Sequence, residues 1–408
     1  MRRLVRALSM IVALALGILS AGTIWTTATT QPGWSIVVQR RDGNLMLIDE
    51  QGQTKALTTD ANGQSILYRF PTPAPDGKSV AMIGLRHGVT YVSSSLVVHP
   101  LNGEPTTLYT EENSHPFYLS WSPDSSKIAF LANDPLGMIL RGVPTNAQSE
   151  ATLIAPGAPS YFAWSPDSSQ LLLHVGGAAP SGSLQIYDWG TDKPRPLSAM
   201  PALFQTPIWL PDGKQALAVV NQASGSTLAT LDTQGSITRQ IAAISDSTMF
   251  VSTPDASQIA YITFGDDAPG ELHVLQVANG EERVIRSGVV TCFWSPTGDE
   301  LAFLTLPDRN EAQTIAQTQP ALRMRWNVLR LSDGDVRSFE LFTPSQEFLA
   351  LLPFFDQYAQ SIRLWDRDGS RLLFATTDGV YTLDVNSGES RLVSEGVLGV
   401  WLDSAKER

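Results

Sequence analysis

The feature that most constrains this chain is a fifteen-residue pattern that occurs seven times. In each copy an apolar run ends at a tryptophan position, a turn of the Ser-Pro-Asp type follows, and a second apolar run begins. The copies are FPTPAPDGKSVAMIG (70–84), YLSWSPDSSKIAFLA (118–132), YFAWSPDSSQLLLHV (161–175), TPIWLPDGKQALAVV (206–220), MFVSTPDASQIAYIT (249–263), TCFWSPTGDELAFLT (291–305) and IRLWDRDGSRLLFAT (362–376). The central position is filled by Pro75, Pro123, Pro166, Pro211, Pro254, Pro296 and Arg367, at intervals of 48, 43, 45, 43, 42 and 71 residues. A period near 43 residues is typical of the four-stranded blades of β-propellers.

Each copy predicts a β-hairpin. Proline presets φ for the second position of a turn, and aspartate or glycine suits the positions that follow. Beyond the hairpin, segments such as LHVLQVANGEERVI (272–285) predict a strand, an Asn-Gly turn and another strand. Stacking such sheets around an axis buries their apolar faces, and closing the ring hides the two open ends. We therefore expect an all-β propeller of antiparallel blades, with the tryptophans packed between blades: Trp121, Trp164, Trp209, Trp294 and Trp365.

The two ends of the repeat array predict how the ring closes. Residues 34–58 contain three strands without an inner one, and EGVLGVWLDS (395–404) adds one inner strand after the seventh copy. We expect this C-terminal strand to complete the first blade, which gives eight blades. Six or seven blades are the alternative, if a weak copy such as 249–285 is not a full blade. The predicted organisation is a signal peptide or membrane anchor (1–28), a linker (29–33), the propeller (34–404) and a tail (405–408).

The repeat WSPDS-x-x-I-A-F resembles that of TolB-type propellers, which also occurs in the propeller domains of prolyl-oligopeptidase-like peptidases. The resemblance extends over nearly all of the chain that follows residue 33. It implies the propeller alone, because the peptidases carry catalysis on a separate domain and no Gly-x-Ser-x-Gly motif is present here. Propellers of this type serve many unrelated functions, so the resemblance does not imply one.

The N-terminus predicts export. MRRLVR is basic, and the nineteen residues that follow it (7–25) carry no charge. As a helix rising 1.5 Å per residue they would span roughly 28 Å, enough to cross a bilayer core. Arg2, Arg3 and Arg6 place the start of the chain on the cytoplasmic side. We expect an extracytoplasmic protein, periplasmic or at the cell surface, that is either anchored through this segment or secreted after a cut near Ala28.

The composition argues against several classes of function. The formal net charge of −12 disfavours nucleic acid as a partner, because phosphate binding needs a basic surface. The single cysteine, Cys292, lies in the apolar run VVTCFW and is expected to be a buried structural thiol. The five histidines, His87, His99, His115, His174 and His273, lack metal-ligand spacing. The repeated aspartates share one turn position, so they are interpreted as turn formers. We expect no cofactor, no metal and no enzymatic activity.

Two insertions interrupt the repeat. PDRNEAQTIAQTQPALRMRW (307–326) links the second and third strands of one blade, and TPSQEFLALLPFFDQYAQSIRLW (343–365) leads into the inner strand of the last one. Both connections emerge on the face that bears the mouth of the central channel, and function on rigid scaffolds concentrates in such loops. The predicted binding rim consists of Phe354, Phe355, Tyr358, Gln360, Arg363, Arg323 and Arg325, with His115, Tyr161 and Phe204 as weaker candidates. The alternative is a plug that only seals a widened blade junction.

Together these features favour a monomeric, membrane-tethered scaffold that binds a protein or peptide partner through this face. Two other functions stay open. One is a hydrolase or lyase with its site in the central channel, and the other is an extracytoplasmic sensor of small molecules.

Overall fold

The computed structural model describes residues 34–88, 92–135, 137–146, 150–202, 205–244, 248–265, 268–308, 311 and 322–402. The predicted leader and linker (1–33) and the tail (405–408) lie outside these ranges. Within them, no helix combines the length and the apolar character needed to cross a membrane.

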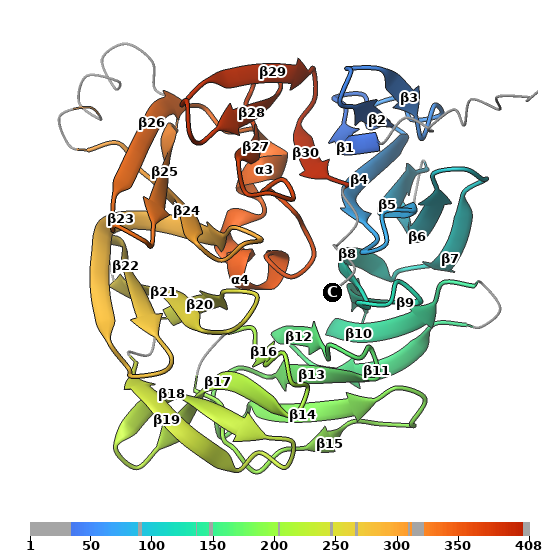
Figure 1. The fold of residues 1–408 in the computed structure, drawn as a ribbon. Coiled ribbons are helices and arrows are strands. Elements are labelled where there is room, and N and C mark those ends of the chain that lie inside the picture. The colour runs from blue at the N-terminus through green and yellow to red at the C-terminus, as the bar shows by residue number, and fades with distance from the viewer. Residues whose placement is uncertain are drawn as a thin grey trace, which may run out of the picture. The chain divides into compact units, whose positions relative to one another are not determined.

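The described residues form antiparallel sheets arranged around a centre (Figure 1). Five of the sheets have four strands each. Their strands are β1 (Trp34–Gln39), β2 (Leu45–Asp49), β3 (Thr54–Ala56) and β30 (Leu398–Trp401); β4 (Ile66–Pro73), β5 (Ser79–His87), β6 (Val92–Pro100) and β7 (Thr106–Glu111); β8 (His115–Trp121), β9 (Lys127–Asp134), β10 (Gly137–Pro144) and β11 (Thr152–Pro156); β12 (Ser160–Trp164), β13 (Gln170–Val175), β14 (Ser183–Asp188) and β15 (Arg195–Pro196); β16 (Ile208–Trp209), β17 (Gln215–Gln222), β18 (Gly225–Asp232) and β19 (Ile237–Ala243).

A sixth sheet has seven strands because one long strand serves two blades. The first part of β23 (Glu282–Trp294) pairs with β22, and its last part pairs with β24. The other strands of this sheet are β20 (Thr248–Ser252), β21 (Gln258–Gly265), β22 (Ala268–Gln276), β24 (Glu300–Thr305), β25 (Met324–Arg330) and β26 (Val336–Phe342).

The last sheet has three strands, β27 (Arg371–Ala375), β28 (Val380–Asp384) and β29 (Ser390–Ser394). A single bridge between Trp365 and Leu372 adds the inner segment of this blade. The propeller fold predicted from the repeat is confirmed. We interpret the pairings as eight blades.

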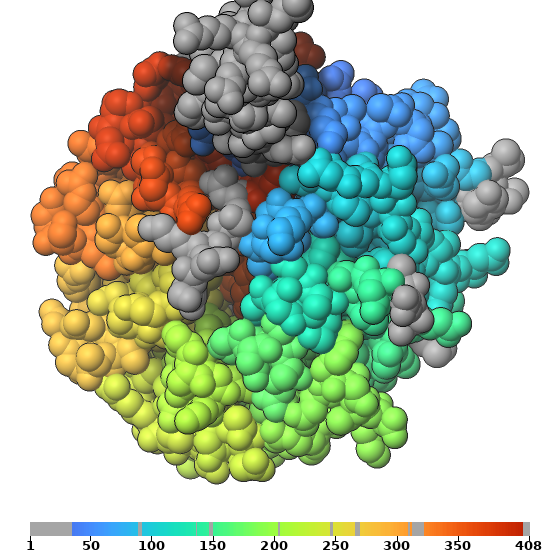
Figure 2. All heavy atoms as spheres, turned by 45° about the vertical axis from the view of Figure 1, so that its right-hand side comes forward, coloured from blue at the N-terminus to red at the C-terminus, as the bar shows by residue number. Residues whose placement is uncertain are grey.

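The ring closes through the C-terminal strand, as its sequence predicts. β30 pairs antiparallel with β1, in a register that joins Ile36 to Trp401 and Gln39 to Leu398. All four residues of β30 are buried. Figure 2, coloured from blue at the N-terminus to red at the C-terminus, shows the blades following one another around the ring in sequence order. The first and the last segments of the propeller are therefore held together by hydrogen bonds between strands.

The repeated tryptophans make the same inter-blade hydrogen bond. In five cases the indole Nε1 donates to a backbone carbonyl of the repeat before it in the chain. The acceptor is the residue immediately N-terminal to the tryptophan position of that repeat. The pairs are Trp121 to Thr72 (2.8 Å), Trp164 to Ser120 (3.2 Å), Trp294 to Val251 (3.2 Å), Trp365 to Phe293 (3.0 Å) and Trp401 to Leu364 (3.0 Å). Trp209 departs from this pattern, since its Nε1 has no partner among the described residues. The tryptophans thus join neighbouring inner strands, in agreement with their predicted position between blades.

The turn of each copy needs one residue in the left-handed region. The second residue after the proline position has a positive φ in all seven copies: Gly77, Ser125, Ser168, Gly213, Ala256, Gly298 and Gly369. The residue before it is an aspartate in six copies and Thr297 in the sixth, and Asp167 is an example of how local hydrogen bonds hold this aspartate. Asp167 accepts hydrogen bonds from the Ser165 hydroxyl and from the backbone amide and hydroxyl of Ser169. These bonds hold the pKa of Asp167 below its ordinary value. These contacts support the interpretation of the repeated aspartates as turn formers.

Ala256→Gly is expected to raise the free energy of unfolding by about 0.5–1 kcal/mol, because an L-residue in the left-handed region is strained and glycine is not. Ala256 has φ 56°. Ser168→Gly is the matched control, since the Ser168 hydroxyl accepts a hydrogen bond from the Asp124 amide of the neighbouring repeat (3.0 Å) and its removal offsets the relief of strain. Chemical denaturation measures both variants. Equal gains, or a loss for Ala256→Gly, would contradict this explanation.

Candidate functional site

The second insertion folds into short helices on the inner side of the ring (Figure 1). We call residues 344–362 the plug segment. It contains α3 (Gln346–Leu349), the 3-10 turn η1 (Leu352–Phe354) and α4 (Phe355–Tyr358). Ser345 begins α3, because its hydroxyl accepts a hydrogen bond from the Phe348 amide (3.1 Å). The same hydroxyl donates to the Val397 carbonyl (2.5 Å), which ties α3 to the link before the closing strand.

Gln357 fastens the plug segment to two inner strands on another part of the ring. Its Oε1 accepts from the Phe162 amide (3.0 Å), and its Nε2 donates to the Phe162 carbonyl (2.9 Å). Its Nε2 also donates to the hydroxyl of Tyr118 (2.8 Å), which in turn donates to the Gln357 carbonyl (3.0 Å). The side-chain amide thus satisfies both backbone groups that Phe162 of β12 presents to the channel. All of these bonds are buried.

Asp356 is fully buried beside Gln357. Its Oδ2 accepts from the Thr206 amide (2.8 Å) and its Oδ1 from the Gln357 amide (2.9 Å). Burial raises the pKa of Asp356 above its ordinary value, against the lowering effect of these hydrogen bonds. Burial, and then the field of Asp356, raises the pKa of Cys292 as well. Cys292 is the buried free thiol that the sequence predicts.

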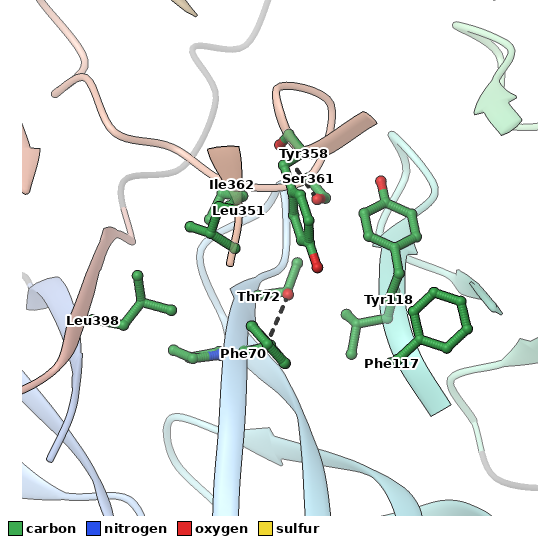
Figure 3. A pocket seen from close by; sticks show the side chains of 11 residues that line it. Phe70, Thr72, Phe117, Tyr118, Leu351, Tyr358, Ser361, Ile362 and Leu398 are labelled. Atoms are coloured by element: carbon green, nitrogen blue, oxygen red, sulfur yellow. Dashed lines mark hydrogen bonds between the residues drawn. The ribbon is translucent and has the colours of Figure 1, made fainter. Parts of the chain in front are cut away.

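Aromatic side chains surround the other end of α4 (Figure 3). The rings of Tyr118 and Tyr358 meet edge to face with centroids 5.2 Å apart, and Phe70 lies 6.5 Å from Tyr358. Phe70 has φ 52°, which is strained for an aromatic residue, and it lies at an irregularity in the pairing of β4. The cavity between these residues has a volume of about 10 Å³. The plug segment and the aromatic side chains therefore leave almost no free volume between them at this point.

A larger pocket lies where the plug segment meets β20, β21, β23 and β25. Its volume is about 420 Å³. Every lining residue is apolar, and both insertions contribute to it: Met249, Phe264, Val290, Met324, Leu349, Leu352 and Pro353. Phe354, which follows Pro353 directly, is 48 % exposed, and Leu322, close to Met324 in the sequence, is 49 % exposed. We call this the apolar pocket.

The predicted rim residues of the plug segment, and Arg363 directly after it, differ in exposure. Phe354 and Gln360 are exposed, and Tyr358 and Arg363 are half-buried. Phe355 is fully buried and its ring lies 6.3 Å from that of Phe293, so it is a core residue that no surface partner can touch. The reason is the helical turn of α4, which directs Phe355, Asp356 and Gln357 inward.

The remaining predicted residues do not converge on one point. Arg325 forms an ion pair with Glu311 (2.5 Å), and Arg323 donates to the Leu341 carbonyl (3.5 Å). His115 Nδ1 lies 3.3 Å from the hydroxyl of Ser94. Tyr161 is buried, and its pKa is raised by that burial and by Asp356. Phe204 lies outside the described residues.

Sequence reasoning missed the residues that anchor the plug segment and most of those that line the apolar pocket. A signal for the anchors was present, because Asp356 and Gln357 are polar residues inside an otherwise apolar stretch. The pocket residues carried no such signal, since Met249, Phe264 and Val290 read as ordinary strand residues. Among the described residues, no group of three or more histidine, cysteine, aspartate or glutamate side chains could hold a metal ion.

No family model and no curated protein matches the sequence. A solved structure from a study of two prolyl endopeptidases is similar at 14 % identity with a TM-score of 0.54. The similarity covers 80 % of this chain and 49 % of that one, so this chain spans about half of the endopeptidase. At this identity the likeness supports the fold alone.

Two further similarities are weaker. TolB from Acinetobacter baumannii has 15 % identity and a TM-score of 0.43, with 74 % of this chain and 77 % of TolB covered. An oligogalacturonate lyase in complex with manganese has 13 % identity and a TM-score of 0.49, with 78 % of this chain and 86 % of the lyase covered. Neither relation bears on function at this level. The comparisons thus agree with a propeller fold and assign no family.

Proposed function

We propose that this chain is an exported, membrane-tethered propeller scaffold that binds a protein or peptide partner through the apolar pocket. The observation that carries the proposal is the all-apolar lining of a pocket that both insertions help to form. Its volume of about 420 Å³ lies within the usual range for binding pockets. Phe354 is 48 % exposed and follows the lining residue Pro353 directly, and an exposed aromatic residue is the kind of anchor that dominates binding energy at protein interfaces.

The anchoring of the plug segment supports this function. Gln357 and Asp356 fix α4 to Phe162 and Thr206, on other parts of the ring. Leu352 and Pro353 of the neighbouring turn line the pocket. A surface held in this way needs little ordering when a partner arrives, and that raises affinity.

An enzyme is the less favoured alternative. General acid–base chemistry needs a titratable side chain within reach of the substrate, and none lines the apolar pocket. Asp356 of the plug segment is buried and bonded to the backbone amides of Thr206 and Gln357. These contacts favour recognition over catalysis. The sequence of the leader supports the extracytoplasmic location and the tether.

Affinity capture from native membranes with the full chain tests the proposal. Phe354→Asp is expected to reduce the captured partner by roughly 30-fold, because loss of a hot-spot aromatic weakens binding by about 2 kcal/mol or more. Met200→Asp is the matched control, since Met200 is 58 % exposed and lies away from the pocket lining. Both variants should melt like the wild type. If Phe354→Asp captured every partner as well as Met200→Asp does, the proposal would be wrong.

A further inference from the structure

Two turns of this chain share the tripeptide Asn-Gly-Glu, at 102–104 and at 279–281. Both connect the third strand of a blade to the fourth, the first turn between β6 and β7 and the second between β22 and β23. The asparagine of each turn, Asn102 or Asn279, is exposed. Because sequence, place in the blade and exposure match, a difference in the chemistry of the two asparagines must come from the local structure.

The second turn engages both groups of its Asn-Gly pair in hydrogen bonds. The Gly280 amide donates to the Gln276 carbonyl (2.9 Å), and Gly280 has φ 73°. The Asn279 side chain accepts from the Glu281 amide (2.9 Å) and donates to the Glu281 carboxylate (3.4 Å). Any movement of this side chain or this amide therefore breaks hydrogen bonds.

The first turn leaves the same two groups to the solvent. Neither the Asn102 side chain nor the Gly103 amide has a hydrogen-bond partner in the part of the chain that the structure describes, and both residues are exposed. A third Asn-Gly pair, at 62–63, resembles the second turn, since the Asn62 side-chain oxygen accepts from the amides of Ser65 (2.8 Å) and Ile66 (3.1 Å). Asn102 thus differs from the other two in having a side chain that can rotate without losing a hydrogen bond.

We propose that Asn102 is a site of spontaneous deamidation. The Gly103 amide loses its proton to hydroxide, and its nitrogen attacks Asn102 Cγ. The new N–Cγ bond closes a succinimide ring, the Cγ–Nδ2 bond breaks, and the departing nitrogen takes a proton from water and leaves as ammonia. A second water opens the ring at either carbonyl, which gives aspartate or isoaspartate. The sequence of steps consumes one water overall and needs no oxidant, reductant or enzyme.

Two features of the first turn favour this reaction. Glycine has no side chain to hinder the approach of its nitrogen to Cγ. An unbonded asparagine side chain can rotate to the attacking geometry, whereas the second turn would first have to break the bonds described above. The product adjoins a contact between blades, because the carbonyl of Leu101 accepts from Lys55 Nζ (2.5 Å). The modification does not depend on the function proposed for the apolar pocket.

Peptide mapping by mass spectrometry of the full chain in detergent tests the proposal. After incubation at mildly alkaline pH, digestion with pepsin at low pH stops the reaction, and the conversion of amide to carboxyl is followed at each asparagine. In the folded chain Asn102 is expected to deamidate at least about fivefold faster than Asn279, because the second turn must first break its hydrogen bonds. In the chain unfolded by urea the two rates should agree within about twofold, because the tripeptides are identical and the local structure is lost.

Gly103→Ala tests the cyclic step. A Cβ at this position would lie 3.4 Å from the Pro100 Cβ, an ordinary contact, and Gly103 lies outside the left-handed region, so the fold should tolerate alanine. The methyl group hinders the attacking nitrogen and should slow deamidation of Asn102 at least about tenfold. The melting temperature shows that this variant retains the fold.

Three results would overturn the proposal. The first is an equal rate for Asn102 and Asn279 in the folded chain. The second is a difference that persists after unfolding by urea, since the cause would then not be the structure of the turns. The third is an unchanged rate at Asn102 in Gly103→Ala, since the reaction would then not pass through the succinimide.

Discussion

Trp401→Ala is expected to lower the free energy of unfolding by about 3–5 kcal/mol, the usual range for removing a buried tryptophan. Trp401 is 2 % exposed and belongs to the four-residue strand that closes the ring. The substitution removes its hydrogen bond to Leu364 (3.0 Å) and the ring under Arg371. Deleting residues 395–408 should destabilise the protein further, because β1 then loses its partner strand. Chemical denaturation followed by fluorescence measures both effects.

Two further variants distinguish the stability lost by disturbing the closing strand from the stability lost by removing any large buried side chain. Trp401→Phe keeps most of the buried ring and should lose only about 0.5–1.5 kcal/mol, the net value of one hydrogen bond, because the Leu364 carbonyl still accepts from the Leu373 amide (2.7 Å). Trp209→Ala removes a tryptophan from the same repeat position, but one whose Nε1 has no partner among the described residues. It should cost less than Trp401→Ala. A normal melt for the deletion would mean that the ring is held closed in another way.

Gln357→Leu is expected to lower the free energy of unfolding by about 2–6 kcal/mol. The leucine fills a similar volume but leaves the amide and the carbonyl of Phe162 without their partner, at about 1–3 kcal/mol for each buried group. Phe162 lies opposite Leu173 in the register of β12 and β13, and its backbone amide and carbonyl both bond to the Gln357 side chain. The effect should appear in thermal and chemical unfolding alike.

Gln360→Leu is the control for this prediction. Gln360 is exposed and lies three residues further along the same segment. Its substitution should change stability by less than about 0.5 kcal/mol. A similar small change for Gln357→Leu would show that the plug segment is not held by these bonds.

The repeat predicted most of the fold because its signals are local. The turn residues, the alternating strands and the tryptophan position all lie within fifteen residues, and each copy is independent evidence for the same sheet. Closure was also predictable, since residues 34–58 lack an inner strand and Trp401 occupies the tryptophan position. The shared strand β23 was not predicted, because nothing in the local sequence marks the continuation from an outer strand into an inner one.

The candidate site was harder to predict because its contacts join distant residues. Gln357 contacts Tyr118 and Phe162, which are separated from it by 239 and 195 positions. Sequence analysis placed Phe354 and Phe355 together on a rim. The backbone turn at α4 directs one outward and the other into the core. The geometry of α4 decides which of two adjacent aromatic residues faces the solvent, and the repeat pattern carries no information about that helix.

The sequence predicts either a plug or a binding surface for this insertion, and the contacts of the plug segment are compatible with both. Its Gln357 side is bonded to Phe162 of another inner strand, and its Leu352 and Pro353 side lines the apolar pocket. These bonds provide the rigid support on which a binding surface can be built.

Photo-crosslinking in native membranes tests the central claim most directly. The full chain would carry the photoreactive p-benzoylphenylalanine at position 354, in place of Phe354, or at position 200, in place of the similarly exposed Met200. The account predicts a discrete crosslinked protein or peptide from position 354 that is absent from position 200. Equal products from the two positions, or none from position 354, would contradict a partner at the apolar pocket.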